Sequence, residues 1–236
     1  MSLPFFYTDP IPPSNNIIVL NEENSKHIVQ VLRMQNGKQI KLTDGFGNIY
    51  LAEIIDAHKK NCNVKIIEKT MQEPQVNKIC VAISPVKNNS RLEWFLEKAT
   101  EIGVTEVVLL ICERTEKQNI RLDRMKGILI SAMLQSQQAW LPILEEPKKF
   151  TEFTKSVQSS SKFIAHCEED KKVSLKETLA IKSFNDTTIL IGPEGDFSPK
   201  EIALALENNF EPVALGNTRL RTETAALVAA TLLCVQ

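Results

Sequence analysis

Two short stretches near the C-terminus carry the residue types best suited to holding a ligand. The first, "LIGPEGDFSPKEI" (190–202), joins an apolar run to a helix start and contains two glycines, a proline and Glu194 within four residues. Glycines permit a positive φ and a close approach of the backbone to a ligand. Ser198-Pro199-x-Glu201 is a capping box with proline at the first helical position. A plain turn needs one glycine, so the pattern favours a ligand loop.

The chemistry of this first loop excludes a phosphate. A Walker loop closes with Gly-Lys-Ser/Thr and a dinucleotide loop needs G-x-G-x-x-G, and neither pattern is present. Glu194 and Asp196 would repel phosphate oxygens. A neutral or cationic ligand is expected instead.

The second stretch, "LGNTRLRTETAALVAA" (215–230), crowds Arg219, Arg221 and Glu223 at the start of a predicted helix. Alanines at 225, 226, 229 and 230 make that helix thin, so that another backbone or a flat ligand can approach it. Taken alone, an ordinary Ala-rich buried helix explains the alanines better. The crowded charges are poor core material, however, and they indicate a polar site.

The elements that would position both stretches alternate between strands and helices after residue 78. Ser90 and Glu93 form a capping box for one helix, and Gly103 ends it. The alternation predicts an α/β domain with a mainly parallel sheet, whose ligands bind beyond the carboxyl ends of the strands. Strands are predicted at 79–84, 105–111, 162–165, 187–191 and 211–215, and helices at 90–102, 122–138, 174–181, 198–208 and 222–236.

The N-terminal part of the chain follows a different pattern. Strands at 17–20, 38–43, 48–57 and 63–69 surround tight turns, and Asn21 can cap a helix that runs to about Leu32. These features predict a small barrel or bent sheet. The polar segment 70–77 is typical of a linker. We therefore expect one domain over residues 1–72 and a larger one over residues 73–236.

The composition of the 236 residues limits the classes of function. The net charge of −1 does not indicate a nucleic-acid binder, although a local basic surface can still contact phosphates. The five cysteines form no Cys-x-x-Cys pair and the three histidines are far apart, so no metal site is expected. Scattered thiols, with neither a secretion signal nor a membrane span, predict a cytoplasmic protein.

The two C-terminal stretches together resemble the signature of the bacterial 16S ribosomal RNA (uracil-N3) methyltransferases, which are SPOUT-class enzymes. Upstream, "SKHIVQVLRMQNGKQIKLTDGFGNIYLAEI" (25–54) resembles the family's PUA-like RNA-binding segment. "PVKNNSRLEWFLEKATEIGVTEV" (85–107) resembles the start of its catalytic domain. The resemblance implies a PUA-like β-barrel followed by a SPOUT α/β domain with a C-terminal trefoil knot. It also implies a homodimer that acts on 16S rRNA or on the small ribosomal subunit.

The same resemblance implies which residues carry the activity, methyl transfer from S-adenosylmethionine to N3 of a uridine. Arg221 would stabilise negative charge on the uracil. Glu223 would either accept the N3 proton or serve only as a carboxylate at the helix N-terminus, where the helix dipole favours it. One departure is Gln138, which stands where an arginine is common. The cofactor would be held by Leu190, Ile191, Gly192, Pro193, Glu194, Gly195, Leu215, Gly216, Leu220, Arg221, Thr222, Thr224 and Ala225. RNA would contact Arg33, Lys87, Arg91, Lys98 and Arg114.

Two alternatives remain open at the level of sequence. One is another SPOUT reaction, such as 2′-O-methylation of ribose. The other is a non-catalytic dimer that only binds RNA. The glycines at 192, 195 and 216, together with Arg221 and Glu223, argue against a decayed site.

Overall fold

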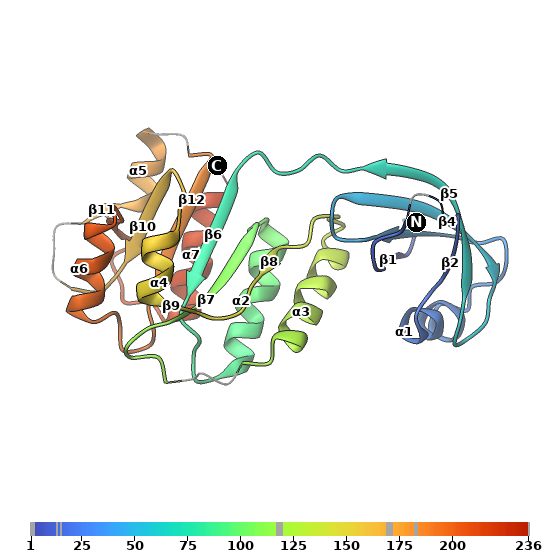
Figure 1. Cartoon of the computed structure of the whole chain (residues 1–236), viewed down its shortest axis with the longest axis horizontal. Coiled ribbons are helices and arrows are strands. Elements are labelled where there is room, and N and C mark those ends of the chain that lie inside the picture. The colour runs from blue at the N-terminus through green and yellow to red at the C-terminus, as the bar shows by residue number, and fades with distance from the viewer. Residues whose placement is uncertain are drawn as a thin grey trace. The chain divides into compact units, whose positions relative to one another are not determined.

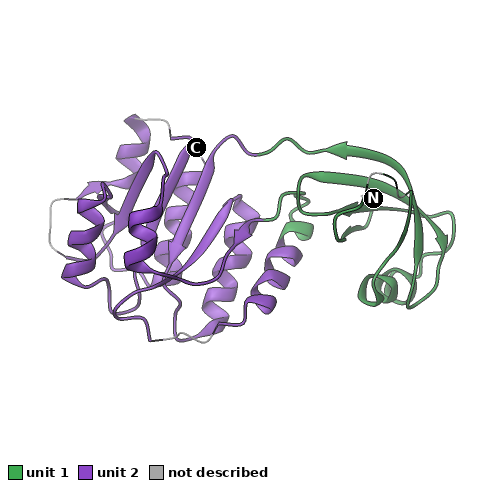
Figure 2. Ribbon diagram, viewed as in Figure 1, with its two compact units in different colours: residues 1–74, 133–141 green, residues 75–132, 142–236 purple. Residues whose placement is uncertain are grey.

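The computed structural model describes residues 3–12, 14, 16–116, 120–168, 172–181 and 184–235 (Figure 1). The chain forms two compact units (Figure 2). The first comprises residues 1–74 together with 133–141, and the second comprises residues 75–132 and 142–236. The return of a short distant segment, 133–141, to the first unit was not expected from the sequence.

The first unit is built on a bent sheet with the strand order β1-β3-β4-β5-β2. β1 runs parallel to β3, and the remaining pairs are antiparallel. Its core contains the fully buried side chains of Ile28, Ile40, Leu42, Ile54 and Val64. The strands are β1 (Phe5–Tyr7), β2 (Ile17–Val19), β3 (Gln39–Thr43), β4 (Asn48–Asp56) and β5 (Asn63–Met71).

The helix of this unit begins as the sequence predicts. Asn21 is the N-cap of α1 (Glu22–Lys26), and its side chain accepts a hydrogen bond from Asn24 N at 2.8 Å. The predicted continuation toward Leu32 is a π-helical turn, His27–Val31, and not α-helix. β1 was not among the predicted strands.

Segment 133–141 packs into the first unit through Trp140. The indole Nε1 of Trp140 donates to Gln72 O at 2.9 Å, and Gly47 N donates to Ala139 O at 2.8 Å. Gly47 has φ 83°. A Cβ at Gly47 would lie only 2.5 Å from Cε2 of Trp140. The indole therefore lies in space that only glycine leaves open.

The second unit contains a sheet in the order β11-β13-β10-β12-β6-β7-β8, and β9 also pairs with β7. All of the described strand pairs are parallel, as predicted. The strands are β6 (Lys78–Ile83), β7 (Glu106–Ile111), β8 (Ile143–Leu144), β9 (Lys148–Lys149), β10 (Ser161–Ala165), β11 (Val173–Ser174), β12 (Asp186–Ile191) and β13 (Glu211–Ala214).

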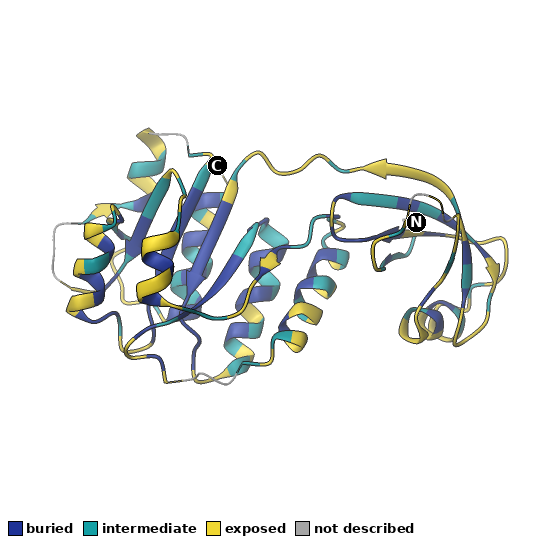
Figure 3. Cartoon of the chain, in the orientation of Figure 1, coloured by how far each residue is buried: buried dark blue, intermediate teal, exposed yellow. Residues whose placement is uncertain are grey.

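Helices cover both faces of this sheet, and its central strands are buried (Figure 3). α7 packs against α2, α5, β6 and β12. α4 and α6 pack against each other, and α4 also packs against β7. The core on the α4 and α6 side includes Phe150, Ile202, Leu110 and Leu190. The helices are α2 (Asn89–Ile102), α3 (Leu122–Gln135), α4 (Phe150–Ser156), α5 (Leu175–Ile181), α6 (Pro199–Glu207) and α7 (Thr222–Cys234).

The start of α2 differs from the prediction. Asn88 is its N-cap, and the Asn88 side chain accepts a hydrogen bond from Ser90 N, so the capping box expected at Ser90 and Glu93 is wrong. The asparagine two residues earlier provides the acceptor, and Ser90 already lies inside the helix. The predicted end is confirmed, since Gly103 takes the left-handed conformation with φ 98°.

The path of the C-terminal segment agrees with the trefoil knot that the family resemblance implies. After β12 the chain passes β10 to form β13 on its other side, and α7 then returns to β6 and α2. In the part of the chain that the structure describes, no helix is long and apolar enough to cross a membrane. The described residues also contain no cluster of His, Cys, Asp and Glu side chains arranged for a metal ion.

Candidate cofactor and catalytic site

The two loops singled out in the sequence leave the sheet at the same edge. β12 and β13 lie on either side of β10, and Ala165 at the end of β10 is paired with Ile191 in β12 and Val213 in β13. Because the strands are parallel, the segments 192–198 and 215–221 flank the carboxyl end of β10. This is the position at which α/β sheets bind their ligands.

The first loop is more tightly folded than its glycines alone suggest. A Cβ at Gly192 would lie 3.1 Å from the Phe197 ring and 3.2 Å from Phe197 N, so this glycine permits close packing. The positive φ expected at Gly192 or Gly195 occurs instead at Asp196, with φ 64°. The Asp196 carboxylate accepts a hydrogen bond from Phe197 N at 2.9 Å, which compensates for the strained conformation. The capping box at Ser198 is confirmed.

The second loop leaves backbone open to a ligand at Gly216. This residue has φ 157°, and no other described residue beyond its two chain neighbours lies within 4 Å of the position that a Cβ would occupy. The side chains of Arg219 and Arg221 are exposed, and Leu220 is half-buried. Arg221 occupies the N-cap position of α7 without a side-chain capping bond. Its guanidinium is therefore not needed to cap the helix.

Glu223 is the most unusual group of the candidate site. Glu223 lies in the first turn of α7, and its side chain is 7% exposed. Oε1 lies 3.6 Å from Arg91 Nε, whereas Oε2 has no hydrogen-bond partner among the residues that the structure describes. A buried carboxylate oxygen without a donor is costly and therefore rare. Glu223 thus offers a ready acceptor for a proton or for a donor of a bound ligand.

The alanines behind Glu223 behave as the ordinary core interpretation predicts. Ala226, Ala229 and Ala230 are fully buried, and α7 packs closely against α2. Thr222 is buried, and Thr224 and Ala225 are half-buried beside the second loop. The thin helix therefore serves helix packing, and its first turn faces the candidate site.

The five residues predicted to contact RNA occupy different environments. Lys87 pairs with Glu116 at 2.7 Å, and this hydrogen bond raises the pKa of Lys87 above its ordinary value, with a smaller contribution from the charge of Glu194. Lys98 bonds two carboxylates of its own helix, Glu97 and Glu101. Lys87 is exposed at the surface, whereas Lys98 is half-buried.

The arginines of that set are more closely tied to other groups. Arg114 donates to the carbonyl oxygens of Gly195 at 2.7 Å and Phe197 at 3.4 Å. Arg91 pairs with Glu223, and Arg33 is exposed in the first unit with φ 53°. Gln138, the departure from the family pattern, donates to Ser136 Oγ at 3.0 Å. A role of these side chains in RNA binding stays a prediction.

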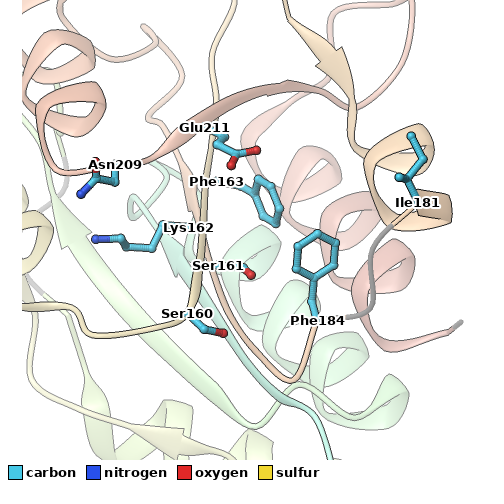
Figure 4. A pocket seen from close by; sticks show the side chains of 8 residues that line it. All are labelled: Ser160, Ser161, Lys162, Phe163, Ile181, Phe184, Asn209 and Glu211. Atoms are coloured by element: carbon cyan, nitrogen blue, oxygen red, sulfur yellow. The ribbon is translucent and has the colours of Figure 1, made fainter.

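A shallow groove of about 760 Å³ lies elsewhere on the second unit (Figure 4). Its lining includes Ser161 at the start of β10 and Glu211 at the start of β13, together with Lys162 and Phe184. These are the amino ends of the strands, opposite to the two candidate loops. None of the predicted site residues lines this groove.

Family comparisons decide what kind of protein carries this site. An RNA methyltransferase domain family matches residues 72–234, and an RNA methyltransferase PUA domain family matches residues 20–67. The chain belongs to the RNA methyltransferase family. The PUA-like and methyltransferase assignments made from the sequence are thereby confirmed.

Solved structures and curated relatives agree with this assignment. A protein described as a "probable rRNA-methyltransferase" from Porphyromonas gingivalis is 38% identical, with a TM-score of 0.88 over 97% of this chain and 96% of that one. Ribosomal RNA small subunit methyltransferase E from Neisseria gonorrhoeae, bound to S-adenosyl methionine, is 26% identical, with a TM-score of 0.83 over 98% and 96%. The enzyme of the same name from Rickettsia conorii is 27% identical over 91% of this chain and 88% of its own.

Proposed function

We propose that this RNA methyltransferase uses S-adenosylmethionine to methylate N3 of one uridine in the 16S rRNA of the small ribosomal subunit. The proposal rests above all on the convergence of the two signature loops at the end of β10, next to the buried carboxylate of Glu223. The relatives named as small-subunit rRNA methyltransferases, one of them solved with S-adenosyl methionine, support the substrate and the cofactor.

We assign cofactor binding to the backbone and side chains of the two loops and of the first turn of α7. The open backbone at Gly216 and the acids of the first loop, Glu194 and Asp196, fit a ligand that carries a positive sulfonium and no phosphate. When bound, S-adenosylmethionine supplies an electrophilic methyl group. The full set is Leu190, Ile191, Gly192, Pro193, Glu194, Gly195, Leu215, Gly216, Leu220, Arg221, Thr222, Thr224 and Ala225.

The catalytic roles follow from the chemistry of uracil. N3 of a uridine carries a proton at neutral pH, and this proton must leave as the nitrogen forms its bond to the methyl carbon and the carbon–sulfur bond breaks. The unpartnered Oε2 of Glu223 is the proposed proton acceptor. Arg221 is exposed and shortly precedes Glu223 in the sequence, and it is proposed to stabilise negative charge on the uracil oxygens. Positioning of the two reactants supplies the remaining acceleration.

We further propose that residues 1–72 act as the RNA-binding domain and residues 73–236 as the methyltransferase domain of a cytoplasmic homodimer. The match of the PUA family to residues 20–67 supports the first assignment. The 43% exposure of Trp94 on α2 is consistent with a helix that another subunit covers. Sedimentation equilibrium of the purified chain tests the dimer, and a single species with the mass of one chain would refute it.

Two measurements test the reaction. Calorimetry with S-adenosylmethionine should show binding to the wild-type chain, and its absence would refute a cofactor-dependent enzyme. Mass mapping of 16S rRNA from a deletion strain should then show the loss of one N3-methyluridine. A retained N3-methyluridine with a lost ribose methyl group would instead identify the enzyme as a 2′-O-methyltransferase.

A further inference from the structure

The first loop, residues 192–198, and the last residue of β12 before it are held by groups that follow three other strands. After β6, Ser84 N donates to Ile191 O at 3.0 Å. After β10, Cys167 N donates to the Asp196 carboxylate at 2.8 Å. After β7, the Arg114 side chain bonds the loop carbonyls. Groups outside the loop therefore support its conformation, in addition to the contacts within it at Asp196 and Phe197.

Arg114 makes the most extensive of these contacts. Its Nη1 donates to Gly195 O at 2.7 Å and to Phe197 O at 3.4 Å, and its Cδ lies 3.5 Å from the position of a Cβ on Gly195. The arginine stem thus lies along the glycine while the guanidinium bonds two carbonyls. At this distance the stem is in ordinary van der Waals contact with the Gly195 backbone, and a small side chain could be accommodated at position 195.

Both of these peptide groups are also bonded from their opposite side. The Gly195 carbonyl shares its peptide plane with the N–H of Asp196, which donates to Pro193 O at 2.9 Å. The Phe197 carbonyl shares its plane with the N–H of Ser198, which donates to Glu201 Oε2 at 2.8 Å. Because a peptide group is planar, a bond at each end fixes its orientation.

Glu201 connects this arrangement back to Arg114. Its carboxylate is 6% exposed, and Oε1 accepts a hydrogen bond from Glu113 N at 2.8 Å. Glu113 directly precedes Arg114, so one buried carboxylate holds both the start of α6 and the backbone that carries the arginine. The segment after β7 and the loop after β12 thereby form one hydrogen-bonded network.

We propose that Arg114 is a positioning residue for the cofactor loop: it fixes the peptide planes of residues 195–198, and Glu201 fixes Arg114. The inference rests on the proposed use of S-adenosylmethionine by this loop. It gives Arg114 a role through the loop backbone, and not primarily through RNA. Nη1 is directed to the two loop carbonyls, so an RNA phosphate could bond only the remaining N–H groups of the guanidinium without competing with the loop.

The test compares Arg114→Ala and Arg114→Lys with a matched control, Arg124→Ala, in the full chain. Arg124 is also an exposed arginine, and its hydrogen bonds among the described residues go to Glu93 on α2. Calorimetry should show an S-adenosylmethionine Kd raised about tenfold in Arg114→Ala, since bonds from a charged donor are lost. Arg114→Lys should recover part of this loss, and Arg124→Ala should match wild type.

Two further measurements separate this role from a structural or RNA-binding one. Amide hydrogen exchange of the peptide covering 192–198 should become about tenfold faster in Arg114→Ala, with or without cofactor. Affinity for an rRNA fragment should stay within about twofold of wild type, as expected for an arginine already bonded to protein. Unchanged loop exchange and an unchanged cofactor Kd, with weaker RNA binding, would overturn the inference. No cofactor binding by the wild type would instead refute the proposed function and this inference with it.

Discussion

Replacement of Gly47 by alanine should destabilise the first unit by displacing Trp140. At φ 83°, any residue with a Cβ is strained, which costs about 1–2 kcal/mol. The added methyl group would also lie 2.5 Å from Cε2 of Trp140. The indole would have to move, which weakens the hydrogen bond from Nε1 to Gln72 O. The close contact between the methyl group and the indole adds to this, at a further cost of about 1–3 kcal/mol.

Gly37→Ala is the matched control for this substitution. Gly37 has nearly the same φ, 81°, but no described residue other than its two chain neighbours lies within 4 Å of its Cβ position. Backbone strain and the reduced entropy of the unfolded chain are therefore common to both variants and cancel in the comparison. The difference between them, about 1–3 kcal/mol, isolates the contact with Trp140.

Denaturant unfolding followed by tryptophan fluorescence measures this difference. The chain has two tryptophans, so Trp94→Phe leaves Trp140 as the sole reporter of the first unit. In that background, Gly47→Ala should lower the midpoint much more than Gly37→Ala and should alter the native emission of Trp140. Equal midpoints for the two alanine variants would refute the argument that the indole requires a glycine at position 47.

Further predictions concern pH, helix capping and thiol reactivity. Burial, reinforced by the charge of Asp44, raises the pKa of Tyr50 above its usual 10.0. The neutral phenol of Tyr50 therefore stabilises the folded state fully below pH 10.0, and this stabilisation is lost as the pH rises through the raised pKa of the folded state. The free energy of unfolding of Tyr50→Phe should consequently depend less on pH in the alkaline range than that of wild type. Ser198→Ala removes a confirmed cap and should lower the free energy of unfolding of the second unit by about 1 kcal/mol, measured by denaturant titration. With a thiol reagent, the exposed Cys167 should react in the native protein, whereas Cys80, whose pKa is raised by burial, should react only after unfolding; a fast phase that persists in Cys167→Ser would contradict this.

Elements with strong local signals could be predicted from the sequence. The long alternating strands, the cap at Asn21, the capping box at Ser198 and the C-cap at Gly103 all depend on neighbouring residues, and each is present. Short pairings such as β8, β9 and β11 were missed because two residues show no periodicity. The helix α4 was missed as well, although it contributes Phe150 to the core.

Contacts between distant segments were beyond the reach of sequence patterns. The glycines of the first loop suggested a positive φ, yet Asp196 adopts it, because its own carboxylate and the packing of Phe197 against Gly192 decide the local conformation. The sequence predicts that Arg114 contacts RNA, because nothing near it in sequence indicates the carbonyls of residues 195 and 197. The sequence predicts loops after β12 and β13, whose role in binding stays a prediction, but it does not predict the network that holds the first of them.

The strand order of the second unit has a consequence for folding. β6 reaches its neighbour β12 only after β7, β8, β9, β10 and β11 have been made, and β13 must then enter between β10 and β11. Such non-local pairing gives a high contact order, which slows folding and keeps apolar strand surface exposed during synthesis. α7, the last helix, covers β6 and also carries Glu223. Completion of the core and assembly of the candidate catalytic site therefore occur together, after the C-terminal residues have been synthesised.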